Sequence, residues 1–467
     1  MANISSAGIG SGIDVEKIVT QLMALEKRPL NSLQAKASTL TTKISAFAQI
    51  KSQLTSLSDA AAKLTSASTW NAKTATSSLS DAVAVTAGGA AAATAFSVQV
   101  QQLASAQLAA SAKVDSTTRF GGGTLEFSIG SRLDPGAPRQ QVSLTVDAGA
   151  SLSEVAAQIN RSDAGVSATL VNDGAGQQQL LLRSKATGEV HGFELQVTDN
   201  GTPAPGQSGL SALLPPGGLA ITDAKNAQAT LNGIAITSAS NTLADTVPGV
   251  SLQLLKKTEP GAAAEITVKD DAPSLQTAVE AFVTAYNAAN ALLASNTRYN
   301  AATKSGALLQ GDSTAVGLQS ALRGILGSTN GASGVFKSLS DIGVGFGKSA
   351  DGSLALDADK LKKALDGNMD GVRALFDASQ PTSVGARLKS FLGAVTGSDG
   401  ALGSKTASLE LQQRANNKDQ DRINDRLGAI EARIRRQYEA LDVVMANSNA
   451  LSSYMSQQIT QWNRNNS

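Results

Sequence analysis

The chain has 467 residues, of which 16% are charged and 3% are aromatic, and its formal net charge is +1. At about 100 to 200 residues per domain there is room for about three domains, and the balanced charge excludes the basic surface that a nucleic-acid-binding protein needs. Cysteine is absent and His191 is the one histidine, which excludes disulfides, thiol catalysis and cysteine-based metal sites.

The first ten residues contain neither a basic region nor a long apolar one, and no apolar run in the chain reaches the length that spans a bilayer. We therefore expect no cleavable secretory signal and no insertion into a membrane. The small, weakly charged side chains bury little surface per helix, which favours long helix pairs and contacts with other subunits.

Two helices are predicted near the N-terminus. Asp14 suits an N-cap, and apolar residues recur at helical spacing from Val15 to Leu25, until Pro29 ends the segment. A longer helix with a coiled-coil-like stripe is predicted beyond Pro29. The stripe contains Leu33, Ala37, Leu40, Ile44, Phe47, Ile50, Leu54, Leu57, Ala61 and Leu64.

From Trp70 onwards, alternating patterns and turn residues replace the helical spacing. Residues 83–85 and 96–100, which flank Gly88 and Gly89, predict a β-hairpin. Short strands follow, with one short helix at residues 151–160 among them, so that one β module is inserted into another. The predicted strand regions are residues 125–129, 142–146, 166–171, 180–182, 193–197, 229–236 and 250–255.

Helix is predicted again from Pro273 to about Tyr299. Residues 343–349 look like a phosphate-binding loop, but the first glycine of that motif would fall on Ile342, so the spacing fails by one position. A hairpin turn followed by a strand at residues 354–356 is the favoured interpretation, and Asp357 is expected to cap the next helix.

The C-terminal stretch has the clearest periodicity, because its stripe positions alternate steps of four and three, as in a coiled coil. Polar residues on such a stripe cost stability but specify register and subunit number. The sequence leaves open whether the stripe packs within one chain or forms a seam between subunits. It contains Asn416, Gln420, Ile423, Leu427, Ile430, Ile434, Gln437, Leu441, Val444, Ser448, Leu451, Met455, Gln458 and Trp462.

Five sequence blocks occur in a characteristic order. The chain opens with GSGIDVEKIVTQLM at residues 10–23, continues with FSVQVQQLA at 96–104, and contains DGSLALD at the start of the block 351–376. Residues 166–188 are similar to a repeat shared among flagellin-type proteins, and residues 231–252 carry a further block. In this order the blocks resemble the flagellar hook-associated protein 2 family of bacterial flagellar filament caps, across essentially the whole chain.

The resemblance and the patterns together predict an α+β multidomain fold. Terminal helices form a coiled-coil or helical-bundle leg, and two β-rich domains lie between them, one nested in the other. Four domains are expected. The leg comprises residues 1–35 and 430–467 and is flexible before assembly, and the helical stalk comprises residues 36–75 and 273–429 with a β-hairpin near 341–357. A β-rich domain comprises residues 76–114 and 223–272, and an outer β domain with the flagellin-type repeat is inserted at residues 115–222.

The resemblance also implies a function. The protein would be a structural cap at the distal end of the flagellar filament, extracellular and exported without a cleavable signal peptide. It would promote polymerisation of exported flagellin, prevent its leakage, and so support filament elongation and motility. The implied partners are further copies in a ring, as a pentamer or hexamer, together with flagellin, the hook–filament junction proteins, and a cytoplasmic export chaperone at the C-terminal helix.

No catalytic, cofactor-binding or metal-binding residues are predicted, and the chain is expected not to be an enzyme. One alternative function is an adhesin that uses residues 115–222, with capping secondary, and another is an enzyme, for which the single His191 leaves little chemistry. A different axial protein, such as a hook–filament junction subunit, is a further alternative, against which the block 351–376 favours the cap. The chaperone contact is expected on the apolar stripe from Leu441 to Met455. Contacts of the leg helices with the filament or neighbouring subunits are predicted at Ile18, Leu22, Leu25, Ile423, Leu427, Ile430, Ile434, Leu441, Val444, Leu451 and Met455.

Overall fold

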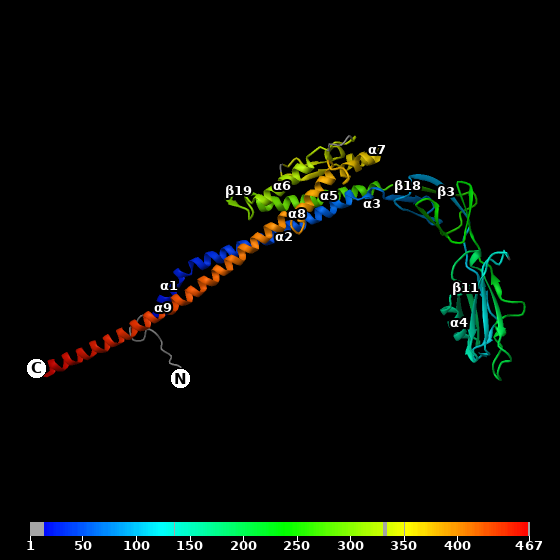
Figure 1. Cartoon of the computed structure of the whole chain (residues 1–467), viewed down its shortest axis with the longest axis horizontal. Coiled ribbons are helices and arrows are strands. Elements are labelled where there is room, and N and C mark those ends of the chain that lie inside the picture. The colour runs from blue at the N-terminus through cyan, green and yellow to red at the C-terminus, as the bar shows by residue number, and fades with distance from the viewer. Residues whose placement is uncertain (1–13, 135, 330–333, 350, 466–467) are drawn as a thin grey trace. The chain divides into compact units, whose positions relative to one another are not determined.

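A computed structural model of the chain describes residues 14–134, 136–329, 334–349 and 351–465. The chain divides into two compact units. The first combines the residues up to Thr69 with those from Ala272 onwards, and the second is Trp70–Asp271 (Figure 1). Helices dominate the first unit and strands the second, so the predicted α+β multidomain fold is confirmed.

The N-terminal helices are α1 (Val15–Glu26) and α2 (Arg28–Thr65). Asp14 caps α1 as predicted, since its Oδ1 accepts a hydrogen bond from the backbone N of Lys17 at 2.9 Å. Pro29 does not end α1, contrary to the prediction, because α1 ends earlier and Pro29 lies in the first turn of α2. A proline is tolerated there because the first helical N–H groups have no intrahelical partner.

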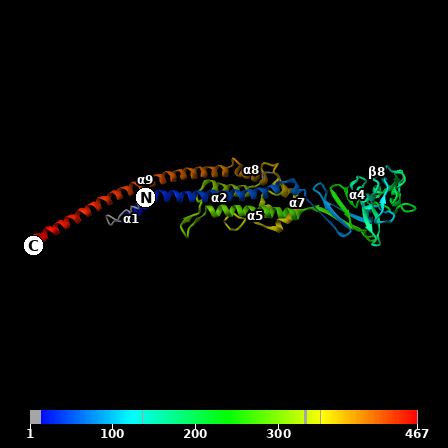
Figure 2. The same cartoon turned by 90° about the horizontal axis from the view of Figure 1, so that it is seen from below.

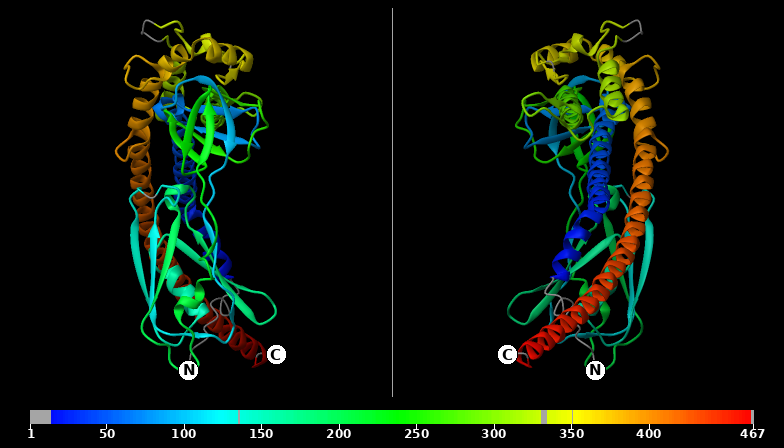
Figure 3. Two further views of the ribbon diagram at one scale, coloured as in Figure 1. Left: turned by 90° about the vertical axis from the view of Figure 1, so that its right-hand side faces the viewer. Right: turned by 90° about the vertical axis from the view of Figure 1, so that its left-hand side faces the viewer.

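The first unit is a bundle in which α2 packs against α5 (Ala272–Thr297), α8 (Val384–Thr396) and α9 (Ala401–Asn465). The right-hand view of Figure 3 shows α2 and α9 running side by side. Much of the predicted stripe of α2 forms its buried face. The buried residues of α2 are Leu30, Leu40, Ala46, Phe47, Ile50, Leu54, Leu57, Ala61 and Leu64.

This unit also contains smaller helices and two small hairpins. Strands β21 (Val344–Phe346) and β22 (Leu354–Leu356) pair antiparallel, which confirms the hairpin in place of a phosphate-binding loop. Asp357 caps the next helix as predicted, accepting a hydrogen bond from the backbone N of Lys360 at 2.9 Å. The other elements are α6 (Ser313–Leu326), α7 (Ala358–Phe376), β19 (Tyr299–Asn300) and β20 (Ser305–Gly306).

The second unit contains two apolar cores, each surrounded by its own strands. We call the part around one core the flanking β body, because its strands precede and follow the other part, the nested β body, in the sequence. One sheet has the order β1-β18-β3-β14-β15 and another the order β16-β17-β2. The strands are β1 (Lys73–Ser77), β2 (Val83–Ala87), β3 (Thr94–Gln102), β14 (Ala227–Leu231), β15 (Ile234–Ser238), β16 (Thr242–Val247), β17 (Val250–Leu254) and β18 (Ala264–Asp270).

The predicted hairpin between residues 83–85 and 96–100 is wrong, because β2 and β3 belong to different sheets. Gly88 begins a turn that does not pair β2 with β3, and its backbone O accepts from Ala91 N at 3.0 Å. Its backbone N donates to the oxygen of Gly249 at 2.8 Å, which extends the pairing of β2 with β17. The stretch 229–236 is itself a hairpin, with Asn232 and Gly233 at φ 50° and 84° in its turn.

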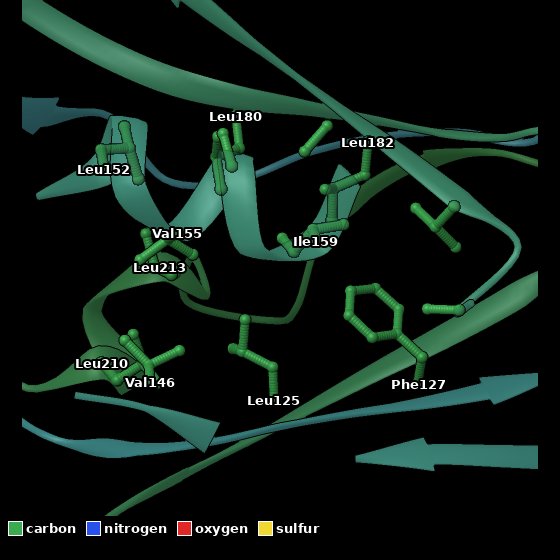
Figure 4. Close-up of a cluster of buried hydrophobic side chains, with 14 of the residues drawn as sticks. Leu125, Phe127, Val146, Leu152, Val155, Ile159, Leu180, Leu182, Leu210 and Leu213 are labelled. Carbon is green, nitrogen blue, oxygen red and sulfur yellow. The ribbon is translucent and has the colours of Figure 1, made fainter. Parts of the chain in front are cut away.

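The nested β body surrounds the second core, in which the apolar side chains of α4 (Leu152–Arg161) meet those of two sheets (Figure 4). Figure 4 shows Val155 and Ile159 of α4 with Leu180 and Leu182 of one sheet on one side and Leu125 of the other sheet on the other. The sheets have the orders β10-β11-β4-β13 and β12-β7-β8. Their strands are β4 (Leu108–Ala110), β7 (Gly123–Ile129), β8 (Gln140–Val146), β10 (Val166–Asn172), β11 (Gln177–Ser184), β12 (Phe193–Asp199) and β13 (Ala220–Thr222).

Candidate assembly surface on the terminal helices

The apolar face of α1 packs on α9. Val15, Val19 and Met23 follow one another at intervals of four residues and are exposed by only 3%, 1% and 4%. With Leu30 and Leu427 they form one buried cluster. The partly buried residues around this cluster all come from α9, namely Ile423, Ile430, Ile434 and Tyr438.

An ion-pair group borders this cluster. Arg435 of α9 holds Glu16 of α1 with both of its terminal nitrogens, Nη2 lying 3.2 Å from Glu16 Oε2, and its Nε lies 3.0 Å from Glu431 Oε1. The hydrogen bond from Arg435 lowers the pKa of Glu16. Because these groups are exposed, they contribute more to the alignment of α1 on α9 than to stability.

The flank of α1 beside this buried face is exposed among the described residues. Leu22 is 37% exposed and Leu25 53% exposed, while Ile18 is half-buried. Within the described part of the chain, α1 therefore packs one face on α9 and leaves the neighbouring flank exposed to another molecule.

Beyond Tyr438, α9 continues past the end of α1 (Figures 1 and 2). We call residues 441–463 the α9 tail. Large apolar side chains along it are exposed, and between Asp442 and Arg464 the sequence has no charged residue. A helix face of this kind is typical of a surface that another molecule covers. Its exposed apolar residues are Leu441, Val443, Val444, Leu451, Tyr454, Met455, Ile459 and Trp462.

The end of the α9 tail carries a shallow, open depression of about 410 Å³ on one side of the helix. Its apolar lining consists of Met455, Ile459 and Trp462, and its polar lining consists of Gln458 and Gln461. The apolar residues are spaced by four and three, so they share one helix face. Neutral amide groups beside an apolar strip can hydrogen-bond to a partner without the desolvation cost of a charge.

The register of α9 on α2 is fixed by polar contacts. Asn416 is 2% exposed, and its Nδ2 donates to the backbone oxygen of Leu33 at 3.0 Å. Gln413 Nε2 lies 2.8 Å from Thr41 Oγ1. Among the described residues, Asn416 Oδ1 has no hydrogen-bond partner, so this side chain lowers stability while it specifies the alignment.

The structure divides the predicted contact residues into two groups. Those of α9 up to Ile434 pack within the chain against α1, and Leu427 is 6% exposed. Those from Leu441 onwards are exposed, as are Leu22 and Leu25. Contacts of either group with the filament or a neighbouring subunit remain a prediction.

Some residues of this surface were missed by the strict coiled-coil spacing. The predicted stripe passes through Gln437, which is exposed, whereas Tyr438 packs beside α1. Val443, Tyr454 and Ile459 also lie off the predicted stripe. An α-helix has 3.6 residues per turn and drifts by about 20° per heptad from a repeat of 3.5, which the alternation of fours and threes does not follow.

The described residues offer little other chemistry. His191 is exposed in a short 3-10 helix (Glu189–His191). Within the described part of the chain, no group of three or more His, Cys, Asp or Glu side chains is placed to hold a metal ion. None of the helices described is both long enough and apolar enough to cross a membrane.

Comparison with known proteins gives matches along the chain. The family models for the flagellar hook-associated protein 2 N-terminus and C-terminus match residues 11–107 and 224–450, and the flagellin hook IN motif matches 124–186. Flagellar hook-associated protein 2 of Escherichia coli K12 is 33% identical, with 98% of each chain covered. The B-type protein of Pseudomonas aeruginosa is 30% identical, with 95% of this chain and 94% of the relative covered.

A solved structure is similar as well. It contains the D1-D2-D3 domains of the flagellar cap protein FliD from Escherichia coli, with 31% sequence identity and a TM-score of 0.62. The match covers 78% of this chain and 99% of that chain.

Proposed function

The chain belongs to the flagellar hook-associated protein 2 family, and we propose that it is the structural cap at the distal end of the bacterial flagellar filament. In this role it promotes polymerisation of exported flagellin and prevents leakage, so filament elongation and motility depend on it. The family consists of structural proteins, and the chain is not an enzyme. The α9 tail carries the proposal, because it extends the α1–α9 pair with an uncovered apolar face.

We further propose that several copies form a ring, as a pentamer or hexamer. The leg made by α1 and the α9 tail would dock among the terminal helices of flagellin and the hook–filament junction proteins, with apolar residues in the holes of facing helices. The exposed positions Leu22 and Leu25 on α1, with Leu441, Val444 and Leu451 on the tail, support this proposal.

Before assembly the tail needs a different partner. We propose that a cytoplasmic export chaperone covers residues 441–455, since exposed apolar helix faces promote aggregation. The protein is then exported and resides outside the cell at the filament tip. The α9 tail is flexible until it docks, because a helix without a partner is marginally stable in water. Of the ends predicted to be flexible, residues 1–13 and 466–467 lie outside the described residues.

A deletion strain tests the capping role. Full-length protein is expected to restore swimming and long filaments, whereas a version lacking residues 433–467 is expected to leave flagellin monomers in the medium. A double variant, Leu451→Ser with Met455→Ser, should behave like the truncation, while Ser453→Ala on the same tail serves as the control. Filaments of normal length in the deletion strain would show that the cap assignment is wrong.

Adhesion through residues 115–222 remains a prediction of lower priority. Purified full-length protein can be tested for binding to immobilised mucin-type glycans. No detectable binding across several such glycans would exclude the adhesive role.

A further inference from the structure

The two β bodies of the second unit are joined where the chain leaves the flanking body near Ala104 and returns near Lys225. The two crossing segments pair with each other, since Ser105 N donates to Lys225 O at 2.9 Å and Lys225 N donates to Ser105 O at 3.1 Å. The backbone N of Gly188, from the nested body, donates to Ser105 O at 3.1 Å. The crossing is therefore a short paired ribbon and not a pair of free linkers.

At this crossing, side-chain amides of the flanking body form hydrogen bonds with backbone groups, as a neighbouring strand would. Asn241 binds both backbone groups of Ala104, with Nδ2 donating to its oxygen at 2.9 Å and Oδ1 accepting from its nitrogen at 2.7 Å. Asn226 Oδ1 accepts from the backbone N of Glu189 at 2.9 Å. Asn226 thus ties the nested body, and Asn241 ties the outgoing segment, to the flanking body.

Within the nested body, the side-chain amide of Gln107 also binds both backbone groups of a single residue, Phe193. It is fully buried, its Nε2 donates to Phe193 O at 2.7 Å, and its Oε1 accepts from Phe193 N at 3.0 Å. Its own backbone N donates to Ser184 Oγ at 2.8 Å. A buried amide with both of its polar atoms paired tolerates little displacement, since any movement leaves them unsatisfied.

A close backbone approach lies beside these amides. Gly188 has φ +98°, and a Cβ at this position would lie 2.5 Å from the Cα of Ala239 in the flanking body. Thr187 Oγ1 donates to Ala239 O at 2.8 Å. Only glycine accommodates both this backbone conformation and this contact, so the local sequence is specific to one seating of the nested body.

We propose that this crossing, consisting of Ala104–Gln107, Glu189, Asn226, Ala239 and Asn241, is a conformational lock that holds the nested β body in one orientation on the flanking β body. Domain pairs within a chain ordinarily move relative to one another unless their interface is extensive. Here directional hydrogen bonds from side-chain amides replace apolar area. The two bodies consequently act as one rigid piece, whatever the assembly in which the protein works.

The absence of cysteine from the chain makes a direct test possible. Thr237→Cys on β15 and Gln177→Cys on β11 replace exposed residues in the two bodies and carry spin labels in the full-length protein. Pulsed dipolar spectroscopy is expected to give one narrow distance distribution for this labelled pair. A broad or multiple distribution in this background would overturn the proposal without any further substitution.

Removing the amides should release the lock. In the labelled background, Asn226→Ala combined with Asn241→Ala is expected to lose the single narrow peak, and Gly188→Val is expected to shift it. Asn160→Ala is the matched control, because Asn160 pairs in the same way with both backbone groups of Ala168 but lies wholly within the nested body. If the double variant stays folded by circular dichroism and keeps the narrow peak, the amides do not form a lock.

Discussion

Lys405 Nζ on α9 donates to Asp312 Oδ2 at the start of α6, at 2.8 Å, and lies 5.6 Å from the ring centre of Phe47 on α2. The same carboxylate caps α6, accepting from the backbone N of Thr314 at 3.0 Å. One partly buried contact therefore links three helices of the first unit.

The Asp312 contact predicts an acid-sensitive part of the stability. Burial raises the pKa of Asp312, but Lys405 and the backbone N–H groups lower it by more, so the net pKa lies below its ordinary value. The contribution is present above the ordinary pKa and is lost as the pH falls through the lowered one. Asp312→Ala should cost about 1–2 kcal/mol near pH 7 and much less near pH 2, measured by denaturant unfolding.

Asp312→Asn separates the two roles of this side chain. An asparagine still caps a helix but carries no charge, so this variant should lose the acid dependence while keeping most of the cap. If Asp312→Ala lowers the free energy of unfolding by the same amount near pH 7 and near pH 2, the Asp312–Lys405 ion pair is not the origin of the acid-sensitive stability.

The cluster between α1 and α9 predicts a local effect of Leu427→Ala. Leu427 is 6% exposed, so its truncation should cost about 2 kcal/mol, mainly as easier opening of α1. Hydrogen exchange of the amides in α1 measures this opening. Leu451→Ala is the matched control on the same helix at 63% exposure, and it should leave the exchange of α1 unchanged while weakening assembly.

Glu16 and Arg435 predict how α1 responds to acid. Because the hydrogen bond from Arg435 lowers the pKa of Glu16, the contact stabilises the docked helix above the ordinary glutamate pKa and is lost as the pH falls through the lowered value. The protection factors of the α1 amides, which correct for the slower intrinsic exchange in acid, should therefore fall on acidification, and Glu16→Gln should lower them already at neutral pH. Glu26→Gln, at the other end of α1, is the control.

The turn before β22 predicts that Gly352→Ala is destabilising. Gly352 has φ +77°, and a Cβ there would lie 2.2 Å from Arg323 Nε, while Tyr286 donates to the oxygen of Gly352 at 2.8 Å. Strain and the displaced arginine should together cost about 2 kcal/mol in denaturant unfolding.

In contrast to Gly352→Ala, Gly317→Ala is expected to stabilise the protein. This glycine lies within α6, and a Cβ there would meet no atom within 4 Å, so the substitution should stabilise the protein by about 0.5–1 kcal/mol. Equal effects of the two substitutions would contradict the strain argument.

Local sequence signals predicted much of the fold because their causes are local. The caps at Asp14 and Asp357 depend on side chains three residues from their partners, and the stripe of α2 depends on helical spacing. The pairing of β2 with β17 was missed because it joins segments more than 160 residues apart, where alternation shows a strand but not its neighbour.

The sequence predicted the candidate surface of α9 as one continuous stripe. It did not predict that α1 covers the first part of the stripe and leaves the second part exposed. The sequence does not show how far α1 reaches along α9, and this reach determines that Ile434 is covered and Leu441 is exposed. The junction between the β bodies was not predicted. Gln107 has no motif around it, and the block at residues 231–252 contains Asn241 but does not show that its side chain binds Ala104. The proposed domain boundaries stay a prediction.

The absence of charged residues from positions 443–463 of the α9 tail has a consequence for the environment in which it can work. Ionic strength weakens contacts between charges, and acid or alkali changes them, but neither acts on apolar and amide contacts in the same way. An association made through residues 443–463 should keep its strength from fresh water to brine and across a wide range of acidity. Temperature, which alters the hydrophobic effect itself, is then the variable to which the joint responds.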